Sequence, residues 1–206
     1  MKPEATSLLE NSEEPSTKLA EIRVNKLAAN VLSGVFTIVL CFAGLKLAQM
    51  LPRHVSWKTW HWNALLASVV VLIPIHELLH GVGLRLFARV PWNKIKFGVM
   101  WHALMPYCAC KVPLLLRAYR QMALLPLWVT GGASIIAVLV FATEWLGILS
   151  GVAVAVSIGD IWMIAKLRRF APELLVQDCP SDIGCDVLTP RRITSGVTKP
   201  ADETDR

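Results

Sequence analysis

Charge is almost absent from four stretches of this 206-residue chain. Each stretch has roughly twenty residues, enough for a helix that crosses a hydrocarbon core of about 30 Å. Hydrophobic residues make up 54% of the chain, and this share is typical of a membrane protein rather than a soluble globule. The sequence therefore predicts a multi-pass membrane protein with four spans, at residues 28–51, 63–84, 123–141 and 146–164.

The chain also lacks a recognisable cleavable secretory signal. The first apolar stretch begins far from the N-terminus, behind several acidic residues, and no small-residue cleavage site follows it. We therefore expect this stretch to be a retained membrane helix. No internal repeat is evident.

A disulfide framework is missing as well. The number of cysteines is odd, one of them falls within a predicted span, and the others fall on the predicted reducing side. Cys108 and Cys110 are separated by one residue, whereas a redox or zinc-knuckle pair has two between its cysteines. We expect free thiols that bind no metal.

The net charge of +6 does not indicate a nucleic-acid partner, because the basic residues are not clustered with aromatics on a soluble face. They precede the first span, fill the connection between the second and third, and follow the fourth. On the other side lie only Lys46, Arg53 and Lys58, and tryptophans mark both outer turns. The positive-inside rule therefore predicts that both termini lie in the cytoplasm. The expected location is a bacterial-type plasma (inner) membrane, with the chain as an integral protein.

Three parts are expected along the chain: a flexible cytoplasmic tail at 1–24, a four-helix transmembrane domain at 25–170, and a partly disordered cytoplasmic tail at 171–206. Prolines and a glycine interrupt the connection at 90–122, which predicts a short hairpin and then an amphipathic stretch. Residues 173–190 resemble a strand, a turn and a strand. The expected fold class is an all-α membrane protein with about four transmembrane helices and a short β-hairpin in the cytoplasmic connection.

Small residues recur at four-residue intervals in the fourth span, at Gly147, Gly151, Ala155 and Gly159. This pattern leaves one helix face with almost no side chain and favours close packing of another helix. Asp160 follows directly after this seam.

Two histidines and a glutamate interrupt the second span in an HExxH arrangement. On a helix His76 and His80 project from the same face, one turn apart, and can hold one metal ion. Glu77 lies about 100° around the helix, where its carboxylate can take a proton from water at the metal without being a ligand. An ionisable group in the bilayer costs roughly 2.5 kcal/mol or more, which favours a metal site over a chance pattern.

A catalytic zinc site normally takes three protein ligands, so one is missing from this helix. Asp160 is the best candidate, because its distance from Lys166 and that of the histidines from Arg85 place all three at a similar depth in the inner half of the bilayer. His102 in the cytoplasmic connection is the alternative ligand.

The segments "IHELLHGVG", "KFGVMWHALMPYCAC", "RAYRQMALLPLW", "SIGDIWMIAKL" and "VQDCPSDIGCDVL" together resemble the putative zincin peptidases, small multi-pass proteins related to site-2 proteases. The resemblance covers about residues 66–188. It implies that His76, His80 and Asp160 bind zinc, that Glu77 is the catalytic base, and that the hairpin offers a strand edge to an unwound substrate. Established site-2 proteases carry their aspartate in a Leu-Asp-Gly context with an upstream Asn-Pro pair, whereas this chain has "IGDIW".

The leading hypothesis is an intramembrane zinc metalloprotease that acts on a membrane-embedded or membrane-adjacent peptide. One alternative is a non-catalytic metal-binding membrane protein with an assembly or regulatory role. The other is a haem- or metal-handling membrane protein, although histidines four apart on one helix suit a single zinc better than the opposed axial positions of haem.

Overall fold

A computed structural model describes residues 17–23, 26–58, 60–100, 105–179 and 184–189 of the chain. His102, the alternative ligand, lies outside the described residues. The predicted disorder near the C-terminus falls mainly outside them too.

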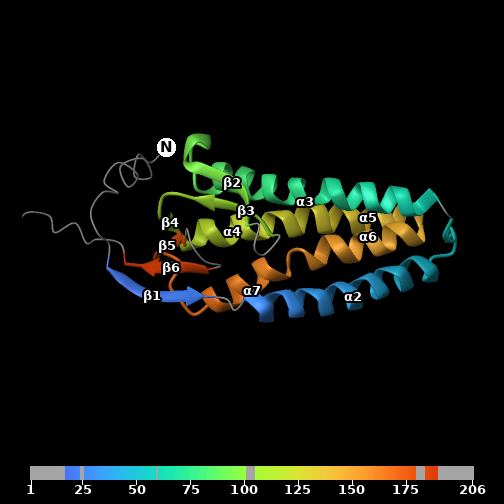
Figure 1. The fold of residues 1–206 in the computed structure, drawn as a ribbon, viewed down its shortest axis with the longest axis horizontal. Helices are drawn as coiled ribbons and strands as arrows, with labels where there is room; N and C mark the ends of the chain where they lie inside the picture. The colour runs from blue at the N-terminus through green and yellow to red at the C-terminus, as the bar shows by residue number, and fades with distance from the viewer. Residues whose placement is uncertain (1–16, 24–25, 59, 101–104, 180–183, 190–206) are drawn as a thin grey trace, which may run out of the picture.

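The described chain is mostly helical, and four helices are long and apolar enough to cross a membrane. They lie alongside one another in Figure 1. Large apolar side chains such as Val39, Val70 and Ile136 are exposed along them, as expected for surfaces that face lipid. The helices are α2 (Lys26–Met50), α3 (Trp60–Phe87), a run of α4 (Leu116–Pro126), the π-helix η2 (Leu127–Gly131) and α5 (Gly132–Phe141), and a run of α6 (Glu144–Ala155) and α7 (Ile158–Leu167).

The third and fourth spans differ in detail from the prediction. The amphipathic stretch expected before the third span is α4, and it continues into the span without a break. The fourth span contains a turn at Val156 and Ser157, where the helical pattern changes before α7 begins. Both residues have weaker helix propensity than the alanines and leucines around them.

The small-residue seam on α6 packs against α2. A Cβ added at Gly44 would overlap the carbonyl oxygen of Gly147, and one added at Gly151 would overlap the backbone of Cys41. Glycine is therefore required here by the close approach of the two backbones. The predicted seam is confirmed for Gly147 and Gly151, whereas a Cβ at Gly159 would meet nothing within 4 Å.

A four-stranded antiparallel sheet lies at one end of the helices, in the order β1-β6-β5-β4 (Figure 1). Its strands are β1 (Lys18–Arg23), β4 (Leu114–Leu115), β5 (Leu175–Asp178) and β6 (Gly184–Leu188). The strand, turn and strand expected after the fourth span correspond to β5 and β6. The all-α expectation did not include this sheet, and it placed β1 within a flexible tail. Half of the residues of β1 are charged, and the strand depends on pairing with β6, which is distant in sequence.

A separate hairpin connects α3 and α4. The 3₁₀ helix η1 (Trp92–Lys94) leads into β2 (Ile95–Met100), which pairs antiparallel with β3 (Met105–Cys110). Strands are therefore present where the sequence predicted a hairpin, and β3 packs against α3. The side of the membrane on which the hairpin lies stays a prediction.

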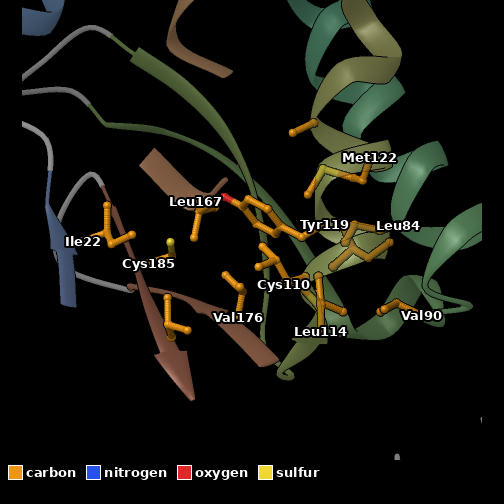
Figure 2. Close-up of a cluster of buried hydrophobic side chains, with 14 residues drawn as sticks. Ile22, Leu84, Val90, Cys110, Leu114, Tyr119, Met122, Leu167, Val176 and Cys185 are labelled. Carbon is orange, nitrogen blue, oxygen red and sulfur yellow. The ribbon is translucent and has the colours of Figure 1, made fainter. Parts of the chain in front are cut away.

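One buried cluster joins the sheet to the helices. Figure 2 shows side chains from β1, β5 and β6 facing others from α3, α4 and α7. Leu84, Leu116, Leu167, Val176 and Cys185 are each at most 1% exposed. Burying one such aliphatic side chain contributes about 1.5–3 kcal/mol, so the cluster holds the strands firmly on the helix ends.

Candidate metal centre

The two histidines of the HExxH segment lie on the buried face of α3. His76 is 6% exposed and His80 is 8% exposed. Their ring centroids are 4.9 Å apart and the ring planes are inclined by 82°. The four-residue spacing therefore brings both imidazoles to one place, as predicted.

Asp160, in the first turn of α7, reaches the same place from another span. Its Oδ2 lies 3.3 Å from Nε2 of His76 and 3.5 Å from Nε2 of His80. One ligand atom from each residue lies within 4.8 Å of the others. In the part of the chain that the structure describes, no other three His, Cys, Asp or Glu side chains are grouped in this way.

The buried atoms of this cluster are incompletely satisfied. Among the described residues, neither Nδ1 of His76 nor Oδ2 of Asp160 has a hydrogen-bond partner. A buried polar atom left without a partner is costly, and a cation among the three side chains would offset that cost at Asp160. Two imidazole nitrogens and one carboxylate oxygen are a typical donor set for zinc, and they leave a coordination position for water.

The backbone of α4 contacts His80 through Nδ1, the ring nitrogen opposite the one that faces Asp160. Nδ1 of His80 lies 3.4 Å from the carbonyl oxygen of Met122. If Nδ1 carries the proton, it donates to this carbonyl and leaves Nε2 as the free nitrogen facing Asp160. Sequence analysis missed Met122, because a backbone carbonyl has no sequence signature.

Glu77 is half-buried on α3 and is not one of the three grouped ligands. Its carboxylate lies against the backbone N–H of Cys108 on β3. This position joins the HExxH helix to the hairpin and leaves the carboxylate beside the histidines. It suits a proton acceptor better than a metal ligand.

Asp178 is a second supporting residue that sequence analysis did not identify. Its Oδ2 accepts a 2.9 Å hydrogen bond from the backbone N–H of Cys110, and Tyr119 of α4 also hydrogen-bonds to it. Burial raises the pKa of this carboxyl, and the two hydrogen bonds act in the opposite direction. Asp178 thus links β5 to β3 and α4, the elements that contact Glu77 and His80.

The five cysteines are free in the structure. Burial raises the pKa values of Cys108 and Cys185 to about 12. Thiols with such pKa values are protonated near neutral pH, and a metal prefers the thiolate. The expectation that the thiols bind no metal stays a prediction.

Comparison with known proteins gives a family. Residues 69–175 match the model of a family described as "Putative zincin peptidase". The match covers just over half of the chain and includes His76, Glu77, His80 and Asp160, so the chain belongs to this family. No curated protein and no solved structure matches the chain. The family description implies zinc, and the donor set of the described cluster fits that ion.

Proposed function

We propose that this member of the family is an intramembrane zinc metalloprotease, with His76, His80 and Asp160 as the metal ligands. The observation that carries the proposal is the convergence of these side chains from two different spans, with Oδ2 of Asp160 within 3.5 Å of both imidazoles. Ionisable groups at this depth are costly unless they pair or bind an ion, and here all three face one another.

Glu77 is the general base in this proposal. Bound zinc would acidify a water molecule and polarise the carbonyl of the scissile peptide bond. The carboxylate of Glu77, beside the ligands but not among them, takes the proton from the attacking water and then delivers it to the leaving amine. The N–H of Cys108 holds this carboxylate toward the hairpin.

The hairpin supports a way to present the substrate. In the described residues, β2 and β3 pair only with each other. On β3 the outward N–H groups of Cys108 and Cys110 already donate to Glu77 and Asp178, so the edge that can accept another strand is that of β2. An extended peptide paired with β2 would lie one strand, roughly 5 Å, beyond β3, whose Cys108 contacts Glu77. A helical transmembrane segment would first have to unwind. We therefore propose that the substrate is a membrane-embedded or membrane-adjacent peptide.

The orientation in the membrane belongs to the same proposal. The strands and the basic ends of α3 and α7 lie at one end of the helices (Figure 1). By the positive-inside rule this end is cytoplasmic, so both termini are cytoplasmic and the site lies in the inner half of the membrane.

Glu77→Gln tests the catalytic role separately from metal binding. Membranes from cells that produce wild type or variant would be compared for new peptide N-termini by mass spectrometry, and the purified proteins for zinc content. We expect Glu77→Gln to keep its zinc and to lose cleavage by a factor of about 10² or more. The matched control is Glu144→Gln, which changes a carboxylate at the far end of the fourth span. Wild-type cleavage by Glu77→Gln would refute the mechanism. Cleavage products absent even from wild type would favour a non-catalytic metal protein.

A further inference from the structure

A second possible binding site lies away from the metal centre, where β1 meets the end of α7. A hollow of about 430 Å³ opens between these elements, and its lining includes Arg23, Lys166, Arg168 and Arg169. The volume lies within the range of small-molecule sites, roughly 300–1,000 Å³. Four cationic side chains and one acidic side chain, Glu21, surround it.

The single carboxylate of the hollow is already engaged. Glu21 pairs with Lys18 at 2.6 Å and with Arg23 at 2.7 Å, and Arg23 also pairs with Asp186 at 3.1 Å. The carboxylates in this region therefore pair with the cations of β1, Lys18 and Arg23. They do not offset the cations of α7 and of the residues that follow it.

The remaining cations have no acidic partner among the described residues. Nζ of Lys166 donates to the carbonyl oxygen of Arg23 at 3.1 Å and lies 5.1 Å from the ring centroid of Trp162. Arg168 and Arg169 are exposed and make no ion pair within the described chain. Three uncompensated positive charges in one concave region repel one another, and a bound anion would remove that repulsion.

The position of the hollow identifies the kind of anion. Leu167 ends both α7 and the fourth candidate span, and Arg168 and Arg169 follow at once. The hollow therefore lies at the depth of lipid headgroups, where basic pockets bind anionic lipids. The positive-inside rule explains basic residues anywhere on this side of the membrane, but it does not require them to gather around a hollow.

We propose that this hollow binds the phosphate group of an anionic phospholipid. The guanidinium groups of Arg168 and Arg169 suit paired hydrogen bonds to phosphate oxygens, and Lys166 adds a point charge beside them. A lipid bound there would connect β1 to the end of α7. Asp160 lies six residues, or roughly 9 Å, before Lys166 on the same helix, so the lipid would also help to fix the depth of Asp160.

Lipid titration of the full chain in neutral detergent tests the proposal. Native mass spectrometry would count bound phosphatidylglycerol, with phosphatidylcholine for comparison. The test variant is Arg168→Gln with Arg169→Gln. Its matched control is Lys94→Gln with Lys96→Gln, which removes two exposed charges, one on η1 and one on β2, at the same end of the helices. We expect one tightly bound phosphatidylglycerol on wild type and control, and at least tenfold weaker binding by the test variant.

Three outcomes would overturn the proposal. If the two double variants lose affinity for phosphatidylglycerol equally, the lipid is held by diffuse attraction to the charged surface. If wild type binds phosphatidylglycerol and phosphatidylcholine equally, the hollow does not recognise an anion. If glycerol phosphate or inorganic phosphate displaced the lipid at low millimolar concentration, the ligand would be a soluble phosphate compound. Arg168→Lys with Arg169→Lys keeps the charge but loses the paired guanidinium hydrogen bonds, so its lipid affinity should fall between those of wild type and the glutamine pair. If the glutamine pair does not fold, Arg169→Gln alone provides the same comparison.

Discussion

Replacement of Asp160 by Asn separates two effects of this carboxylate: the cost of its charge within a span, and its contribution to zinc binding. A charged carboxylate within a span costs about 2.5–3.5 kcal/mol, and Asn has nearly the same shape without the charge. In the absence of metal, the variant should therefore be at least as stable as wild type. Zinc should stabilise wild type more than the variant, because in the variant the oxygen that faces both imidazoles has lost its charge.

The size of this difference in zinc-dependent stabilisation follows from the change in zinc affinity. Loss of an outer-shell partner typically weakens metal binding 10–100-fold, and loss of a ligand should weaken it at least as much. At a free zinc concentration of 100 times the wild-type Kd, binding stabilises wild type by about 2.7 kcal/mol. A variant with 100-fold weaker binding gains only about 0.4 kcal/mol at the same zinc concentration. The expected difference in zinc-dependent stabilisation is therefore about 2 kcal/mol.

Two measurements check this prediction. Equilibrium dialysis with metal analysis gives the zinc affinity, and unfolding with and without zinc gives the stabilisation. Glu144→Gln is the control, because that carboxylate hydrogen-bonds to Gln49 and to the backbone N–H of Trp57, far from the histidines. If Asp160→Asn binds zinc as tightly as wild type, then Asp160 is not the third ligand. His102 would be the next residue to test.

Three further predictions concern the support of the site. Gly44→Ala should destabilise the α2 and α6 contact by about 1–3 kcal/mol in unfolding, whereas Gly34→Ala on the open side of α2 should be neutral or stabilising. Cys108 and Cys185 should resist iodoacetamide at pH 8 in the folded protein and react once it is unfolded, because their pKa values are about 12. Burial alone would raise the pKa of Asp186, but hydrogen bonds from two β1 cations lower it overall. The stability that Asp186 contributes is therefore present above about pH 3.9, its ordinary pKa in the unfolded chain. This stability is lost as the pH falls through the lower pKa of Asp186 in the folded protein. Asp186→Asn should remove this acid-dependent step from thermal unfolding curves.

Much of the candidate site could be predicted because its signals are local. His76, Glu77 and His80 occupy one helical turn, so their spacing alone indicates a shared place. Asp160 could be matched to them by depth, since a membrane restricts each span to a narrow range of positions. The α6 seam was predictable for the same reason, because small residues at helical intervals show one face of one helix.

The sheet and the supporting contacts depend on distant pairing and could not be predicted in this way. Residues 18–23 mix charged and apolar residues without a regular period, and they form a strand because β6 and the cluster around Ile22 provide a surface for them. Asp178 ends a four-residue strand, and its role depends on β3 and Tyr119, which lie beside it in the fold. No pattern within either segment contains this information.

The placement of α4 explains how two spans can present one site. α4 packs against both α3 and α7, and the carbonyl of its Met122 faces His80. Arg120, two residues earlier on the same helix, donates to the carbonyl oxygens of Leu167 and Phe170 at 2.7 and 3.1 Å, and so ties α4 to the end of α7. One short helix thus contacts the histidine helix on one side and the aspartate helix on the other. The amphipathic character of α4 follows from this position, because it must satisfy polar groups of both neighbours while its apolar side chains fill the shared core.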